Sequence, residues 1–115
     1  MQTVGLTALV EKLKLKNLTP EVDMSNIAIT TPNINRPALQ LAGYFDHFAS
    51  DRVQIIGYVE YTYLKHLTAE QRVPIYEKFL SSEIPCVIFS SRTEPDEEFL
   101  RLAIQNNKPD RKVGE

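Results

Sequence analysis

The stretch PCVIFSS, Pro85–Ser91, decides the fold of this chain. Within it, Cys86 to Phe89 form a continuous apolar run. Such a run between polar boundaries is typical of a strand that is buried on both faces of a sheet. This segment is therefore the clearest strand that the sequence predicts.

The residues that follow, RTEPDEEFLRLAIQNN, Arg92–Asn107, predict a helix. We expect Pro95 at its first position, where a missing backbone N–H costs nothing, and acidic residues in its first turn, where the helix dipole favours negative charge. The acids are Asp96, Glu97 and Glu98, and the expected inner stripe is Leu100, Ala103 and Ile104. A strand that leads into a helix is typical of α/β folds.

The same alternation extends toward the N-terminus. We expect strands at Leu15–Leu18, Ile27–Thr30 and Val53–Ile56, and helices at Leu6–Leu13, Tyr58–Leu67 and Thr68–Leu80. The stretch Tyr58–Leu67 also alternates like a strand, but the glycine before it favours a helix. Thr68 and Gln71 have capping-box spacing, and Pro74 is expected to kink or restart that helix. The predicted fold class is α/β, a small three-layer α/β/α domain with a largely parallel or mixed sheet.

Length and composition limit the possible functions. The chain has 115 residues, of which 43% are hydrophobic, so we expect one domain at 1–107 and a polar tail or artificial end at 108–115. A net charge of −2 offers no positive field for nucleic acid, and no apolar run reaches the roughly 20 residues of a membrane helix. One cysteine and no signal peptide predict a cytoplasmic protein.

Polar residues follow the predicted strands at their carboxyl ends, where α/β folds usually bind ligands. They are Arg36, Gly57, Tyr58, Ser91 and Arg92. If the strands are parallel neighbours, two guanidinium groups and a helix N-terminus face one crevice, which suits a phosphate or carboxylate. The alternative is structural, with each arginine paired to a nearby acid or capping a carbonyl.

Residues for catalysis are few. His47 and His66 are the only histidines and lack metal-ligand spacing, so we predict no metal site, and Cys86 lies in an apolar strand where a thiol acts as a small hydrophobe. The four glycines, at positions 5, 43, 57 and 114, permit neither a Walker loop nor Gly-x-Gly-x-x-Gly. We therefore predict no catalytic residues in this chain.

Three stretches carry a family resemblance. They are ITTPNINRPALQLAGYF, DRVQIIGYVEYTYLKHL and IPCVIFSSRTEPDEEFL, at residues 29–45, 51–67 and 84–100. Arg-Pro before Leu-x-Leu-Ala-Gly-Tyr-Phe, Arg-Val-Gln-Ile-x-Gly-x-x-Glu, and Pro-Cys-Val-Ile before Glu-Pro resemble the N-terminal domain of HPr kinase/phosphorylase. HPr is the histidine-containing phosphocarrier protein of the bacterial phosphotransferase system. The family normally continues after the last helix with an apolar strand, whereas residues 108–115 are charged, so we expect that strand to be missing or altered.

The resemblance implies a non-catalytic, regulatory or scaffolding domain of a bifunctional serine kinase/phosphorylase that controls bacterial carbon metabolism. In the family, a second domain carries the Walker loop and acts on a serine of HPr, so ATP and magnesium are expected only there. The implied partners are that catalytic domain and, indirectly, HPr. Full-length family members form hexamers chiefly through the catalytic part, so the isolated piece is expected to be a monomer.

Two alternatives from other functional classes are kept. The first is a sensor for an anion or a phosphorylated ligand, because the predicted strand ends converge at Arg36, Gly57, Tyr58 and Arg92. A UDP-sugar-type binding domain is the related possibility, because the family is similar in fold to the N-terminal domain of muramoyl-peptide ligases. Those ligases have Asp-Ser-Arg where only Arg36 aligns here. The second is a docking module that uses the aromatic residues Tyr44, Phe45, Tyr58 and Tyr61. In the stretch around them we expect Leu39, Leu41 and Ala42 on the core and Gly43 in a tight turn.

Overall fold

The computed structural model describes residues 4–113 as five helices and seven short strands. The helices are α1 (Leu6–Leu13), α2 (Ala38–Leu41), α3 (Tyr58–Lys65), α4 (Ala69–Leu80) and α5 (Glu97–Gln105). The strands are β1 (Val4–Gly5), β2 (Lys16–Asn17), β3 (Ala28–Ile29), β4 (Ile34–Asn35), β5 (Val53–Ile56), β6 (Val87–Phe89) and β7 (Asp110–Lys112). Among these described residues, no helix has the length and hydropathy needed to cross a membrane.

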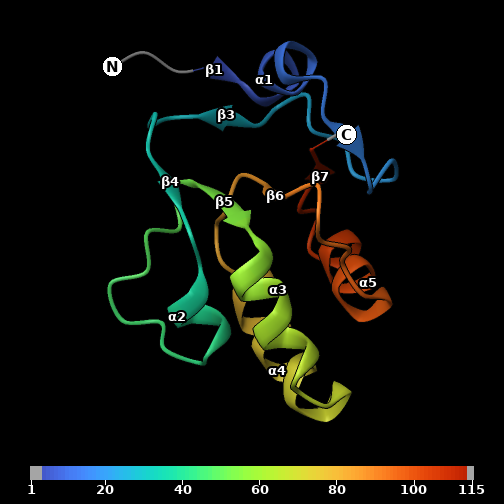
Figure 1. Ribbon diagram of the computed structural model, residues 1–115. Coiled ribbons are helices and arrows are strands. Elements are labelled where there is room, and N and C mark those ends of the chain that lie inside the picture. Colours follow the sequence, from blue (N-terminus) through green and yellow to red (C-terminus); the bar gives the residue numbers. More distant parts are fainter. Residues whose placement is uncertain (1–3, 114–115) are drawn as a thin grey trace.

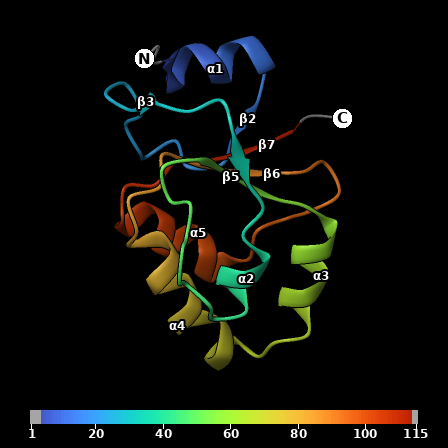
Figure 2. The ribbon, with the colours of Figure 1, turned by 90° about the vertical axis from the view of Figure 1, so that its left-hand side faces the viewer.

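Five of the strands form the central sheet, in the order β2-β7-β6-β5-β4. β4, β5, β6 and β7 run parallel, and β2 pairs antiparallel with β7 at one edge, so the sheet is mixed. Figures 1 and 2 show α1 and the two-stranded β1–β3 ribbon on one face of the sheet and α2 to α5 on the other. The predicted α/β class and layer order are confirmed.

Side chains of β5 and β6 alternate between the two faces, as the pleat requires. Ile56, Val87 and Phe89 join a core with α2 to α5, whereas Val53, Cys86 and Ile88 join a second core under α1. Because both faces are covered, these strands are apolar apart from the buried Gln54, which explains the run at Cys86 to Phe89. Burial raises the pKa of the Cys86 thiol to about 12 and keeps it neutral, which fits a structural role.

Most of the predicted elements are present, including α3 and the edge strand β2. The capping box that begins α4 is confirmed, because the Thr68 hydroxyl accepts the Gln71 N–H and the Gln71 side chain accepts the Thr68 N–H. The helix continues unbroken past Pro74, so the restart proposed there is wrong. The strand predicted at Ile27–Thr30 exists as β3 but pairs with β1 in the ribbon, and β4 takes the place beside β5 instead.

Two details of α5 differ from the prediction. The helix begins at Glu97 and not at Pro95, because the Asp96 carboxylate accepts the Phe99 N–H and makes Asp96 the N-cap. The buried stripe is Phe99, Leu102 and Ala103, while Leu100 and Ile104 are half-buried. The stripe is turned toward the aromatic core, where the Phe99 ring packs edge-on against Tyr76 and Phe89.

In the turn after β4, the buried residues also differ from those expected. Gln40 and Leu41 are buried, whereas Leu39 is 62% exposed and Ala42 is exposed. Gln40 is buried because its side chain has hydrogen-bond partners there: it accepts from the Asn35 side-chain amide and donates to the Tyr44 carbonyl. Gly43 has a φ of +96°, which confirms the tight exit.

The polar tail predicted at 108–115 is wrong for residues 110–112, which form strand β7 inside the sheet. Asp110 and Arg111 are almost completely buried. The backbone of β7 pairs with β2 and β6, and the Arg111 guanidinium donates to the Thr19 hydroxyl and to the Asp110 carbonyl. Backbone pairing and polar contacts therefore hold a charged strand where apolar patterning gives no signal.

The Asp110 carboxyl is a weak point of this strand. Within residues 4–113 neither of its side-chain oxygens has a hydrogen-bond partner, and burial raises its pKa well above the usual range. Because the pKa of Asp110 is higher in the folded state, the free energy of unfolding decreases as pH rises from the unfolded-state pKa of about 3.9 to the folded-state pKa. Above both values the loss is about 1.4 kcal/mol for each tenfold difference between the acid dissociation constants of the folded and unfolded states.

We predict that Asp110→Asn removes this loss. The variant should resist urea better than the wild type at pH 7. The gap should close as pH falls through the unfolded value of about 3.9, because below it the Asp110 carboxyl is protonated in both the folded and the unfolded state. Urea unfolding followed by circular dichroism across this pH range provides the measurement. The exposed Asp51→Asn variant is the control and should show no such gap. A constant difference between Asp110→Asn and the wild type at every pH would contradict the prediction.

Candidate functional site

An ion pair lies at the carboxyl ends of β4 and β5. The Nε of Arg36, the residue after β4, donates to Glu60 Oε1 over 2.7 Å, and its Nη2 donates to Oε2 over 2.9 Å. Glu60 belongs to the first turn of α3 and also accepts the Gly57 N–H over 2.9 Å. The Glu60 side chain is 3% exposed and that of Arg36 is 50% exposed. A buried carboxylate is thus held by a forked guanidinium and by a helix N-terminus.

The electrostatics of the pair are dominated by these contacts. Burial by itself would raise the pKa of Glu60, but hydrogen bonds from Arg36 and Gly57 outweigh it and lower the pKa below its usual value. The hydrogen bond to Glu60 raises the pKa of Arg36. The pair is therefore charged at neutral pH, and Glu60 occupies the place in the arginine fork that an external anion would take.

Gly57 is needed at this point for its lack of a side chain. A Cβ atom built on Gly57 would lie 2.4 Å from Nη2 and 3.0 Å from Cζ of Arg36. Its φ of −98° is open to any residue, so the constraint comes from the close approach of the guanidinium. The sequence suggested a turn into a helix here but held no sign of this contact.

We predict that Gly57→Ala and Arg36→Ala each destabilise the fold by about 1–3 kcal/mol, because both leave the buried Glu60 carboxylate without its full set of partners. In the Arg36→Ala background, Gly57→Ala should cost much less, since the new methyl group meets no guanidinium. Urea unfolding of the two single variants and the double variant measures this coupling. Additive costs would show that Gly57 is required for another reason.

Of the other predicted site residues, Tyr58 and Arg92 meet at the same turn of α3. The Arg92 guanidinium carbon lies 4.7 Å from the centre of the Tyr58 ring, a cation–π contact. Tyr58 is 50% exposed, and Ser91 is half-buried in the loop that holds Arg92. The structure thus brings Arg36 to Gly57 and Arg92 to Tyr58, on the first turn of one helix. Anion binding by this set stays a prediction.

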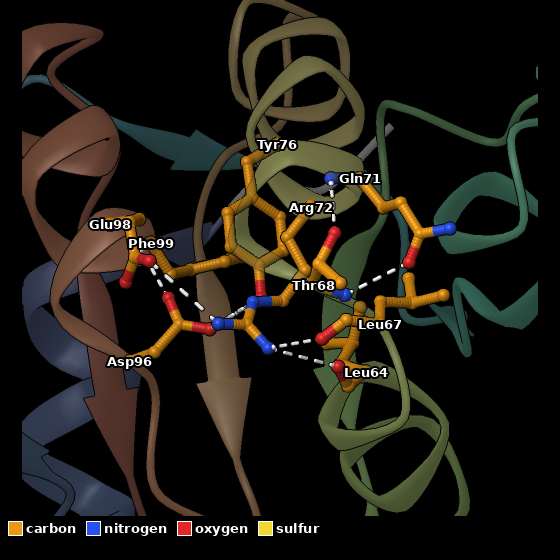
Figure 3. A network of polar contacts seen from close by, with 9 residues as sticks. All are labelled: Leu64, Leu67, Thr68, Gln71, Arg72, Tyr76, Asp96, Glu98 and Phe99. Atoms are coloured by element: carbon orange, nitrogen blue, oxygen red, sulfur yellow. Dashed lines mark hydrogen bonds and ion pairs between the residues drawn. The ribbon is translucent and has the colours of Figure 1, made fainter.

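A pocket of about 240 Å³ opens at the carboxyl ends of β5 and β6, and its polar wall is a network that the sequence analysis missed. Arg72 Nη1 donates to the carbonyls of Leu67 and Leu64, over 2.8 and 3.3 Å, and Arg72 Nε lies 3.4 Å from Asp96 Oδ2 (Figure 3). The Tyr76 hydroxyl donates to the same Asp96 oxygen over 2.7 Å. Arg72 therefore ties the end of α3 to the start of α5.

The residues of this network could not be found by motif. Burial, together with the hydrogen bond to Asp96, raises the pKa of Tyr76 and keeps its hydroxyl a donor. The spacing of the acids predicted a helix start, and Asp96 does cap α5, but its second oxygen has the separate role of holding Arg72 and Tyr76. The pairing depends on tertiary contact between α4 and α5.

A larger apolar groove of about 620 Å³ lies on the other face of the sheet, between α1 and the β4 edge. Its lining residues include Leu9, Leu13, Ile34, Ile55 and Ile88. Neither this groove nor the smaller pocket is lined by Arg36, Ser91 or Arg92. The predicted anion residues therefore form a surface around a helix turn, separate from both hollows.

The aromatic residues of the docking hypothesis divide into two pairs. Tyr44 and Tyr58 are each 50% exposed, whereas Phe45 and Tyr61 are partly buried. Phe45 packs against the core and contacts Phe48 edge-on. The exposed aromatic surface is thus smaller than the sequence suggested.

Comparisons with known proteins give a consistent result. Residues 4–109 match the family described as HPr Serine kinase N terminus. An HPr kinase/phosphorylase of Lachnoclostridium phytofermentans is 49% identical, with a match covering 95% of this chain and 35% of that protein. Proteins of the same name from Caldicellulosiruptor bescii and Streptococcus thermophilus are 43% and 41% identical, over 93% and 90% of this chain and 34% of each relative. The chain thus spans about a third of the length of these curated relatives.

A solved structure shares the fold. The crystal structure of the CBS and DRTGG domains of the regulatory region of Clostridium perfringens pyrophosphatase, complexed with the activator diadenosine tetraphosphate, superposes with a TM-score of 0.60. The match has 15% identity and covers 95% of this chain and 40% of that one. At this identity the likeness concerns the fold alone.

Proposed function

The chain belongs to the HPr serine kinase N-terminal family, and we propose that it is the non-catalytic, regulatory or scaffolding part of a bifunctional HPr kinase/phosphorylase. The observation that carries this proposal is the match over residues 4–109 in a chain that spans about a third of its relatives. The remaining two-thirds of such a protein would hold the catalytic domain, the bound ATP and magnesium, and the contact with HPr.

The residues of this chain support a role without phosphoryl transfer. No glycine is followed by lysine, so the backbone cradle and the lysine that bind nucleotide phosphates are both missing from the sequence. At the carboxyl ends of the strands, Arg36 is paired with Glu60 and Arg72 with Asp96. These guanidinium groups hold helices in place, which suits a rigid module that positions another domain.

We predict that the 115-residue chain transfers no phosphate to HPr. The assay incubates purified chain with HPr, ATP and Mg²⁺ and detects phosphoserine by intact mass, with a full-length HPr kinase/phosphorylase as positive control. HPr incubated with the chain should stay unmodified over a time in which the full-length enzyme phosphorylates all of the HPr in the control sample. Phosphoserine formed by the chain alone would overturn the proposal.

As a second candidate we propose an anion sensor, which one observation favours. Arg36 and Arg92 contact Gly57 and Tyr58 respectively, so two guanidinium groups flank the first turn of α3. Because Glu60 already fills the fork of Arg36, an anion would be held mainly by Arg92 and by the outer N–H groups of Arg36. The chemical class that suits this surface is a phosphate ester, including phosphorylated sugars and UDP-sugars.

We predict for this candidate that inorganic phosphate, a sugar phosphate or a UDP-sugar raises the thermal unfolding midpoint of the chain. Arg92→Ala should abolish the rise, whereas Arg101→Ala, an exposed arginine on α5, should leave it unchanged. Isothermal titration of the wild type and both variants adds a direct measurement. An unchanged midpoint with all three ligands, or an equal response from Arg92→Ala, would rule the sensor out.

A further inference from the structure

One face of α3 is left uncovered. Glu60 and Leu64 point into the domain and are buried, whereas Tyr58, Val59 and Tyr63 are 50%, 68% and 40% exposed. Val59 and Tyr63 are four residues apart and so lie side by side on the helix surface. We call the surface formed by Tyr58, Val59, Tyr63 and Arg92 the α3 face. The Arg92 guanidinium stacks on the Tyr58 ring.

We propose that the α3 face docks against the part of the polypeptide that follows residue 115. This inference rests on the proposed function, in which a further two-thirds of the protein follows this domain. It deepens that function by naming the surface through which the domain contacts the catalytic part.

The place where the chain leaves the sheet supports this partner. β7 runs parallel to β5 and β6, so Val113 lies at the end of the sheet from which α3 begins. The Val113 N–H donates to the Phe89 carbonyl over 2.9 Å, and Lys112 pairs with Glu94. Glu94 lies in the same loop as Arg92. The following segment thus starts beside the loop whose arginine covers Tyr58.

The chemistry of the α3 face suits a protein partner. Tyrosine and arginine are among the residues most enriched at interface hot spots, and one buried aromatic side chain removes ~150–250 Å² from water. Tyr58 has already lost part of its conformational freedom through its contact with Arg92 and through the Tyr61 ring 6.3 Å away. Fewer rotamers therefore remain to be fixed when a partner binds.

The groove beside α1 is the competing surface. Its rim exposes Val4, Leu13 and Ile34, at 49%, 54% and 51%. It lies against β4, however, at the edge of the sheet opposite β2, and on the α1 face. The groove reaches Ile88 on β6, the strand next to β7, but it lies on the α1 face of the sheet, whereas α3 lies on the opposite face (Figure 1). Arg92 of the α3 face is in the same loop as Glu94, which pairs with Lys112 at the end of β7.

Tyrosine footprinting tests the proposal. Hydroxyl radicals label exposed tyrosines, and the rates for the full-length HPr kinase/phosphorylase are compared with those for the 115-residue chain. We expect labelling of Tyr58 and Tyr63 to fall at least threefold in the full-length protein, while Tyr44, which is 50% exposed on another segment, keeps its rate. Equal rates for Tyr58 and Tyr63 in both proteins would overturn the proposal.

A matched pair of variants of the full-length protein sharpens the test. Val59→Glu puts a charge on the α3 face at a position 68% exposed, and it should restore the labelling of Tyr58 and Tyr63. Leu13→Glu puts the same charge on the groove rim, at a position 54% exposed, and should leave their protection intact. Restoration by Leu13→Glu and not by Val59→Glu would contradict the inference. Phosphorylation of HPr by the isolated chain would refute the proposed function without changing these footprints, so the two failures are distinguishable.

Discussion

The contact between Arg36 and Glu60 governs how the sheet meets the helices. It joins two segments 24 residues apart, the end of β4 and the first turn of α3, and it lies against Gly57, where any side chain would intrude. A buried carboxylate is tolerated only when its oxygens are paired, and here they receive two guanidinium N–H groups and one backbone N–H. The edge strand, the turn and the helix therefore depend on one another at a single point.

Much of the fold follows from local patterns, and the exceptions have physical causes. β6, α1, α3 and the capping box at Thr68 could be predicted because apolar spacing and turn chemistry act within a few residues. β7 could not, because Asp110 and Arg111 are charged and their burial depends on Thr19, about 90 residues earlier in the chain. The sequence predicts the strand β3 but not its pairing with β1, because a strand pattern does not indicate which strand is its neighbour.

The candidate site also contains residues that could be predicted and partners that could not. Arg36, Gly57, Tyr58 and Arg92 were selected as residues at strand ends, and the structure places them on one helix turn. Their partners were harder to foresee. Glu60 stands three residues after Gly57, a spacing from which a cap could have been inferred, but Arg72 and Tyr76 meet Asp96 only because α4 packs on α5. Pairing within the chain, which the sequence does not reveal, decides which guanidinium groups already hold a carboxylate, as Arg36 and Arg72 do.

The pairing of β2 with β7 has a consequence for how the chain matures during its synthesis. Lys16 lies opposite Lys112, so the sheet pairs a strand near the start of the described residues with a strand near their end. A ribosome releases these segments in order, and β2 must wait without its partner until residues 18–109 have been synthesised. β2 therefore joins the central sheet late, and nascent chains halted before residue 110 would leave two strand edges unpaired and prone to association.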